Sequence, residues 1–351
     1  MTNKKTLVFS LGTLVGSCLL FITIGSFVIA SQDKVPAFTG EYDVNAKEEL
    51  LVVTEYEGSE TLSLVSNNEK AISLFESEVD AYIFSPIYTN DHTAVFIQTT
   101  GYDYGDYIDE TTSEFAYSTI QSIDLSTNEV TIIAEARGVL FDLVYIPTSD
   151  QLVVSGENIT QGTEPQPVGR AETKLFNVND SELEVIYEGS PVLPSSIQAT
   201  NDGQLMMILP DDQGSWTVDS MYESIERVFS ANPTENPLNL ELVSNPDKIE
   251  PITSFAQIED GLIYQTIFNY QESDAIYDYD LIPYSYNNKK EGTRLGISGH
   301  EIEALLYPKK DVLYYVKRTD AYRNGNDFSL HRHDLRSGTG IEINLLPQTD
   351  E

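Results

Sequence analysis

Cysteine and positive charge are both scarce in this sequence, and each scarcity excludes a class of protein. The single cysteine, Cys18, rules out an intramolecular disulfide and a cysteine-rich zinc site. Only 20 Lys and Arg residues stand against 56 Asp and Glu residues, which gives a formal net charge of −36. Phosphate recognition requires clustered Lys and Arg, so the composition argues against a nucleic-acid partner.

The sequence also lacks the motifs of several common enzyme classes. It contains no Gly-x-Ser-x-Gly nucleophile elbow, no glycine-rich phosphate loop and no dinucleotide-binding fingerprint. Cys18 lies in a long apolar segment, which excludes it as a catalytic thiol. These absences favour a protein without enzymatic activity. Hydrolysis by a pair of carboxylates is still an alternative, because a chain with so many acids always contains some pair at a suitable distance.

A long uncharged segment is present near the N-terminus. Lys4 and Lys5 precede residues 6–32, which include no charged side chain. A membrane-spanning helix needs about 20 apolar residues, whereas the core of a signal peptide has about 7–15. We therefore predict that residues 1–34 form a membrane anchor, inserted through residues 6–30.

The two lysines also predict the orientation of this anchor. Positively charged flanks stay in the cytoplasm, so residues 35–351 are expected outside, in a single-pass protein of the cell membrane. Val28 and Ala30 are small residues that suit cleavage before Ser31. A signal peptide that is removed, leaving a secreted protein, is therefore the alternative.

Beyond residue 34 the sequence consists of short apolar runs separated by Asn, Asp, Gly and Ser. Residues 50–53, 94–97 and 130–133 are representative, and such runs recur at intervals of about 8–12 residues. No convincing amphipathic helix interrupts them, and the best candidate, residues 221–229, fits a strand equally well. The pattern predicts an all-β fold such as a sandwich, a barrel or a propeller.

A degenerate repeat organises these runs. Five segments share the same order of an apolar strand, a turn with Pro or polar residues, and a second strongly apolar strand. The turns are predicted to begin near residues 86, 147, 201, 259 and 308, so the repeat recurs about every 50–60 residues. A sixth, more obscure unit covers roughly residues 37–78.

The hairpins of this repeat resemble those of a known family. Phe84-Ser85-Pro86 before an apolar strand resembles a hairpin motif of TolB-like six-bladed β-propellers, and Asp202-Gly203 and Asp260-Gly261 occupy the matching turn. The stretch 123–128, Ile-Asp-Leu-Ser-Thr-Asn, is similar to the end of that family's third strand. The resemblance implies a six-bladed β-propeller of four-stranded blades over residues 35–351, and it leaves the function open. A pair of two-sheet sandwiches is the alternative fold.

Two tyrosine-rich acidic segments are the candidate binding sites. Tyrosine offers a large amphipathic surface with few rotatable bonds, although it is also common in ordinary strand packing. The predicted contact residues are Tyr102, Tyr104, Tyr107, Tyr277 and Tyr279. Bunched carboxylates also suit Ca²⁺, so the candidate metal ligands are Asp103, Asp106 and Asp109. Their spacing differs from that of an EF-hand, and a solvated acidic loop is the simpler interpretation.

One histidine pair has the spacing of metal ligands. His331 and His333 fall on one face of a predicted strand, and Asp334 follows them. Arg332 is expected on the opposite face. Two ligands are too few for a stable site, so a third would have to come from elsewhere in the fold.

The combined hypothesis is a membrane-anchored extracytoplasmic propeller that acts as a binding or scaffold module. Its ligand would be a protein, a peptide or a glycan bound at the loops of one rim. No cofactor is expected apart from calcium. The alternative is a propeller hydrolase that cleaves a glycoside, a lactone or a phosphate ester with rim carboxylates, with or without calcium.

Overall fold

The computed structural model describes most of the chain beyond the N-terminal segment. The described residues are 35–66, 71–101, 116–160, 173–189, 194–211, 224–272, 277–297, 301–319 and 327–345. They are all-β, and within them no helix is long and apolar enough to cross a membrane. The predicted anchor or signal peptide, residues 1–34, lies outside the described residues and stays a prediction. All the strands belong to one compact unit, Ala37–Glu351.

The first half of this unit is one extended sheet of eleven strands, of which ten follow each other in chain order. The fourth strand, β4, pairs beside β3 at an edge, and a parallel bridge between Ser59 and Ala81 links β3 to β5. The strands are β1 (Ala37–Val44), β2 (Leu50–Tyr56), β3 (Ser59–Val65), β4 (Ile72–Glu76), β5 (Ala81–Asn90), β6 (Thr93–Thr100), β7 (Tyr117–Asp124), β8 (Val130–Ile146), β9 (Gln151–Thr160), β10 (Thr173–Asn179) and β11 (Glu182–Gly189).

The second half consists of three separate antiparallel sheets of four strands each. Each sheet is a simple meander, because every strand pairs with the next one along the chain. The first contains β12 (Ser195–Ala199), β13 (Leu205–Pro210), β14 (Glu226–Ala231) and β15 (Glu241–Leu242). The second contains β16 (Ile252–Ile258), β17 (Gly261–Ile267), β18 (Tyr279–Ser285) and β19 (Lys290–Glu291). The third contains β20 (Glu301–Lys309), β21 (Val312–Thr319), β22 (Asp327–Asp334) and β23 (Thr339–Glu342).

The long strand β8 belongs to two four-stranded groups within the eleven-stranded sheet. Its first half pairs with β7 and its second half pairs with β9. The change occurs at Gly138, whose φ is +101° and whose N–H donates to the Ala116 carbonyl at 2.9 Å. A Cβ at this position would lie 2.7 Å from two backbone carbonyl oxygens of β9, so only glycine fits the bend.

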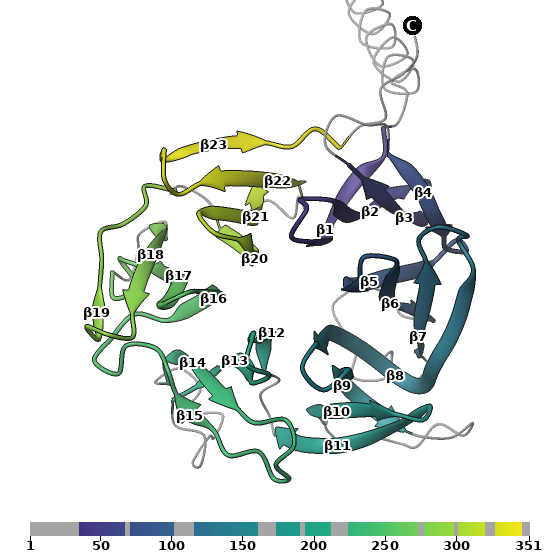
Figure 1. Cartoon of the computed structure of the whole chain (residues 1–351), viewed down its shortest axis with the longest axis horizontal. Coiled ribbons are helices and arrows are strands. Elements are labelled where there is room, and N and C mark those ends of the chain that lie inside the picture. The colour runs from purple at the N-terminus through teal and green to yellow at the C-terminus, as the bar shows by residue number, and fades with distance from the viewer. Residues whose placement is uncertain are drawn as a thin grey trace, which may run out of the picture. The chain divides into compact units, whose positions relative to one another are not determined.

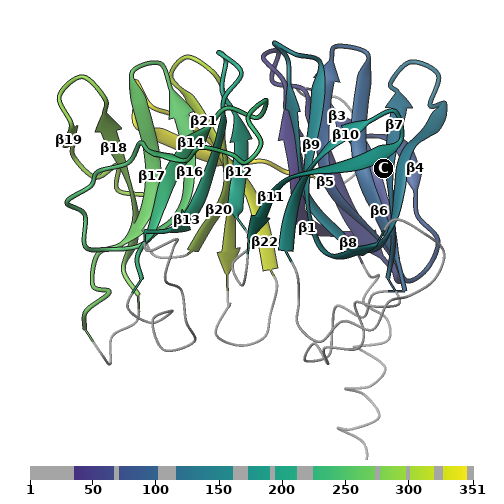
Figure 2. The same ribbon diagram turned by 90° about the horizontal axis from the view of Figure 1, so that it is seen from below.

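The strand groups surround a central space in a propeller-like β fold (Figure 1). Innermost strands β1, β5, β8, β12, β16 and β20 contact one another in that order, and β20 returns to β1. In the perpendicular view innermost strands such as β1, β12 and β20 run along the axis of this space (Figure 2).

Apolar clusters between successive groups hold the ring together. Strands such as β13 and β17 are buried on both faces, which explains their consecutive apolar residues; every residue of β13, Leu205–Pro210, is buried. One cluster joins Val52 of β2 to Tyr314 and Leu330 of the last sheet, so the first and last groups share a core. Each fully buried Leu, Ile or Phe side chain contributes about 1.5–3 kcal/mol to folding.

A buried carboxylate reinforces the junction between the first and last groups. Glu48, in the turn after β1, accepts hydrogen bonds from Arg332 Nε at 2.6 Å and from the Tyr314 hydroxyl at 2.9 Å. It also forms an ion pair with Lys309. The Arg332 guanidinium, together with the Lys309 ammonium, lowers the pKa of Glu48 to about 2. We call these four residues the closure cluster.

Four of the five predicted turns are confirmed and one is wrong. Residues 147–150, 201–203, 259–260 and 310–311 form turns between strands, the last of them just beyond Pro308 at the end of β20. Pro86, however, lies inside β5, which continues to Asn90, so that the turn begins only at residue 91. Both strands are the innermost of their groups, and such a free edge tolerates the missing N–H of proline.

Candidate functional site in the central cavity

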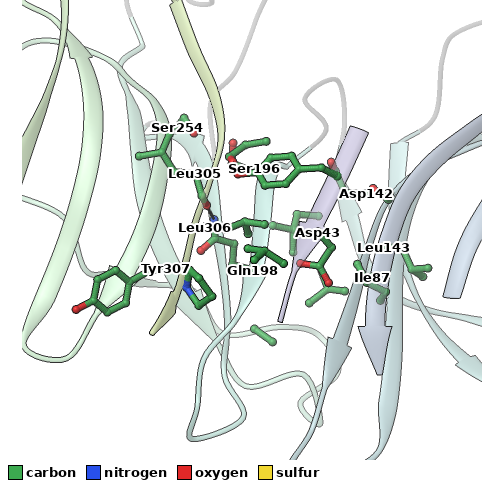
Figure 3. Close-up of a pocket in the computed structure, with 18 of the residues that line it drawn as sticks. Asp43, Ile87, Asp142, Leu143, Ser196, Gln198, Ser254, Leu305, Leu306 and Tyr307 are labelled. Carbon is green, nitrogen blue, oxygen red and sulfur yellow. Dashed lines mark hydrogen bonds between the residues drawn. The ribbon is translucent and has the colours of Figure 1, made fainter. Parts of the chain in front are cut away.

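The innermost strands line a cavity of about 840 Å³ (Figure 3). Each of these strands has a register shift against its neighbour at the level of the cavity. Three of the shifts coincide with positive φ angles, of 44° at Ser85, 49° at Ser196 and 46° at Ala304. Bulges of this kind turn backbone polar groups out of the strand ladder, so they face the cavity or the adjacent strand.

Two carboxylates of β1 bind the exposed backbone edge of β5. Glu41 Oε2 accepts the Ser85 N–H at 2.8 Å, and Asp43 Oδ2 accepts the Tyr88 N–H at 2.7 Å. Burial raises the pKa of both carboxyl groups to about 7. Repulsion from Asp142 contributes to the raised pKa of Glu41. Both groups therefore change charge close to neutral pH.

Two further acids come from strands on other sides of the ring. Asp142 of β8 is held by the Ser155 hydroxyl at 3.5 Å, and burial raises the pKa of its carboxyl group to about 6. Burial and the neighbouring Glu301 raise the pKa of Glu303 on β20, while the Arg318 guanidinium at 3.4 Å opposes this shift. The negative charges of Asp142 and Glu303 both contribute to the raised pKa of Glu41, so the three acids share one electrostatic environment.

The charge of the cavity wall has a single sign. No Lys, Arg or His side chain is found among the described residues that line it. The acids in the lining are Glu41, Asp43, Asp142, Asp202, Glu259 and Glu303. A ligand that neutralises this charge gains a large electrostatic advantage over one that does not.

Neutral polar side chains complete the wall. Gln198 of β12 donates to the carbonyl oxygens of Phe255 at 2.7 Å and Leu305 at 2.9 Å, which fixes it across the two neighbouring inner strands. Ser254 of β16 is only 1% exposed, and its hydroxyl has no hydrogen-bond partner within the described part of the chain. Figure 3 shows Ser254 and Asp142 on different sides of the cavity. The Tyr88 hydroxyl of β5 is likewise buried without a partner in the described residues, so the site combines hydrogen-bonded polar groups with two unpartnered hydroxyls.

The tyrosine and calcium predictions remain untested. Tyr102, Tyr104, Tyr107, Asp103, Asp106 and Asp109 all fall outside the described residues. Tyr277 is 41% exposed and its ring meets the edge of Tyr279, which is 8% exposed, at a centroid distance of 6.0 Å. The Asp278 between them pairs with Arg294 at 3.2 Å. Neither tyrosine lines the central cavity.

The histidine pair is packed into the last sheet. His331 stacks on Tyr315 with ring centroids 5.2 Å apart and hydrogen-bonds the Ser329 hydroxyl at 2.9 Å. His333 is 6% exposed. Arg332 lies on the opposite face, as predicted, where it binds Glu48. Across the described ranges no three His, Cys, Asp or Glu side chains are grouped closely enough to hold a metal ion.

Sequence reasoning did not identify the cavity acids. Glu41, Asp43, Asp142 and Glu303 are four among 56 acids, and they are far apart in the chain. One local indication was available, because Asp142 interrupts an apolar strand between Phe141 and Leu143. A charged residue inside an apolar strand is costly unless it has partners or a function.

No protein-family profile and no curated protein sequence matches this chain. Similar solved structures include a prolyl endopeptidase, with a TM-score of 0.53 and 11% identity over 88% of this chain and 50% of that one. TolB from Acinetobacter baumannii has a TM-score of 0.52 and 12% identity over 89% of this chain and 63% of TolB. An oligogalacturonate lyase from Vibrio parahaemolyticus has a TM-score of 0.51 and 13% identity over 90% and 83%.

These similarities concern the fold alone, because every identity is far below 25%. They support a TolB-like propeller architecture, as the hairpin motifs predicted. The chain spans about half the length of the prolyl endopeptidase and less than two thirds of the TolB chain. The activities of those proteins are not transferred to this one.

Proposed function

We propose that residues 35–351 form a six-bladed β-propeller that binds an extracytoplasmic protein, peptide or glycan. The N-terminal segment would hold it at the outside of the cell membrane through residues 6–30, or would be removed as a signal peptide. The four-strand grouping around the central space supports the six-bladed arrangement, with β8 serving two adjacent blades. The mass of the mature N-terminus in native membranes distinguishes an anchor from a cleaved signal.

The observation that carries the binding function is the central cavity. It has the volume of a ligand pocket, and its polar groups are fixed by hydrogen bonds to neighbouring inner strands. A rigid wall loses little conformational entropy when a ligand binds. We therefore place the main ligand contact in the cavity and keep Tyr102, Tyr104, Tyr107, Tyr277 and Tyr279 as proposed rim contacts.

A capture experiment with matched variants tests this function. The full chain, solubilised in detergent, is used to retain partners from the native cell envelope. Ile87→Trp fills space at the cavity wall, whereas Ile132→Trp makes the same change at a side chain of β8 that is 56% exposed. We expect wild type and Ile132→Trp to retain the same partner and Ile87→Trp to lose it. Because Ile87 also packs against a core cluster, thermal melting is used to verify that Ile87→Trp remains folded at the capture temperature.

Two outcomes contradict the proposal. If wild type retains no partner, the binding function is wrong. If Ile87→Trp folds and retains the same partner as wild type, the ligand does not bind in the cavity.

The raised carboxyl pKa values favour a second candidate function, hydrolysis of a glycoside, a lactone or a phosphate ester. General acid–base catalysis works best with groups that titrate near the operating pH, and burial raises the pKa of Glu41 and of Asp142 into that range. Turnover in a screen of such esters and glycosides, abolished by Glu41→Gln or Asp142→Asn alone, would establish this alternative. Turnover that both variants retain would exclude these carboxylates as its source.

A further inference from the structure

We infer that the group bound in the central cavity is an organic cation, the ammonium or guanidinium of a basic side chain or amine. This inference rests on the proposed binding function and deepens it by naming the chemistry of the ligand. It draws on two independent features. The first is the set of wall acids Glu41, Asp43 and Asp142, since no cation is found among the described residues that line the cavity. The second is the buried Ser254 hydroxyl, which has no hydrogen-bond partner in the described residues.

The acids of the wall have unused acceptor capacity. A carboxylate has about four lone-pair directions. Glu41 accepts the Ser85 N–H, and Asp43 accepts the Tyr88 N–H together with a backbone bond from Val44, so each carboxylate has further directions for a ligand. Asp142 accepts the long 3.5 Å contact from the Ser155 hydroxyl and a hydrogen bond from its own backbone N–H. A cation with several N–H donors would occupy these vacant directions and offset the cost of burying the charges.

The hydroxyl of Ser254 points to a ligand independently of the acids. A buried polar atom without a partner costs free energy, and native proteins rarely keep one without a reason. Ser254 lies on β16, next to β20 with Glu303, and it lines the same cavity as Glu41. Its oxygen would accept a further N–H of a cation bound by the acids.

The arrangement fits a cation of several atoms better than a single metal ion. Glu41, Asp142 and Glu303 come from three different strands around a cavity of about 840 Å³. Metal ions need oxygen ligands that converge on one point at about 2.0–2.6 Å. Guanidinium and ammonium groups instead present donors in several directions, which suits acceptors spread around a wall.

Calorimetric titration of the full chain in detergent tests the inference with small synthetic peptides. The probes are acetyl-Gly-Arg-Gly-amide and its lysine analogue, which separate the two cations. The matched neutral probes contain citrulline in place of arginine and acetyl-lysine in place of lysine. We expect saturable binding of at least one basic peptide, with the matched neutral peptide weaker by about tenfold or more.

Variants identify the site of this binding. Glu41→Gln keeps an oxygen for the Ser85 N–H, and Asp142→Asn is equally conservative, so both are expected to fold and to weaken binding of the basic peptide by about tenfold or more. Glu182→Gln on the outer strand β11, where the side chain is exposed and does not line the cavity, serves as the control. Its affinity is expected to match that of wild type.

Several results would overturn the inference. The inference is wrong if basic and neutral peptides bind with equal affinity, or if neither basic peptide binds saturably. It is also wrong if both cavity variants leave the binding of the basic peptide unchanged. Binding of CaCl₂ or MnCl₂ alone that Glu41→Gln abolishes, without any basic-peptide binding, would replace the organic cation by a metal. If the envelope partner is still lost with Ile87→Trp in these cases, the proposed binding function stands and only the ligand chemistry is wrong.

Discussion

Replacing Glu48 by Gln is expected to weaken the junction between the first and last strand groups. Glu48 is 8% exposed, and Arg332 and Lys309 lower its pKa from the usual 4.5 to about 2. A shift of this size corresponds to about 3 kcal/mol, at about 1.4 kcal/mol per pKa unit. Because Lys309 and Arg332 remain partly in water, we reduce the expected loss to about 2 kcal/mol.

The loss is measurable by thermal unfolding and depends on pH. A unit of roughly 300 residues unfolds with an entropy of about 0.6 kcal/mol/K, so 2 kcal/mol lowers the melting temperature by about 3 °C. A carboxyl group with a lowered pKa stabilises the fold above its unfolded pKa, and this contribution disappears as the pH falls through the folded pKa. The difference between wild type and Glu48→Gln is therefore full at pH 7 and shrinks between about pH 4.5 and 2.

The assay is circular dichroism of the purified full chain at several pH values. The control is Asp91→Asn, which removes the 2.8 Å pair with Lys47, an exposed pair from which we expect no measurable change. Equal melting temperatures of wild type and Glu48→Gln at pH 7 would refute the closure cluster as a stabilising feature. A difference that persists unchanged at pH 2.5 would refute its electrostatic origin.

Three further predictions concern the cavity, the bend in β8 and calcium. Burial raises the pKa of Glu41 to about 7, so ionising this group destabilises the fold as the pH rises from about 4.5 to 7. The melting temperature of Glu41→Gln should therefore lie above that of wild type at pH 8 and equal it at pH 4. Gly138→Ala places a Cβ 2.7 Å from backbone oxygens at a φ of +101°. Denaturant titration should therefore show a free energy of unfolding lower by about 2–4 kcal/mol. A decrease below about 0.5 kcal/mol would contradict the role of Gly138 in the bend. Calcium binding by the loop 101–114 predicts a higher melting temperature in Ca²⁺ than in EDTA, abolished by Asp106→Asn; identical melting curves would exclude it.

The all-β class could be predicted from sequence because the apolar alternation is local. The turn after β7 was equally predictable, since Asp124 Oδ1 accepts the backbone N–H groups of Ser126 and Thr127 at 2.8 and 2.9 Å. These bonds form between residues two and three apart, and Asp, Ser and Thr favour such turns wherever they occur. Local chemistry of this kind is visible in a sequence before any tertiary contact is known.

The position of Pro86 shows where local reasoning failed. Proline and serine usually signal a turn, but Ser85 and Pro86 form a bulge inside β5. The bulge is stable because Glu41, from another strand, accepts the Ser85 N–H. A motif cannot reveal a partner 44 residues away in the chain, so it could not distinguish a bulge from a turn.

The candidate site was unpredictable for the same reason on a larger scale. Glu41, Asp142 and Glu303 become neighbours only when the innermost strands meet around the central space. In the sequence each resembles many other acids of a highly acidic chain. Their raised pKa values come from burial in the assembled ring, which no single segment provides.

Because β8 is shared by two strand groups, the N-terminal half of the ring should open differently from the C-terminal half. Backbone hydrogen bonds run without interruption from β5 to β11. If one strand group in this half opens, it disturbs the backbone hydrogen bonds of the group beside it. Sheets β12–β15, β16–β19 and β20–β23 are joined to their neighbours by side-chain packing, with no ladder between them in the described ranges. Each can detach as a separate cooperative unit, so amide protons should exchange with solvent earlier and in smaller groups in the C-terminal half than in the N-terminal half.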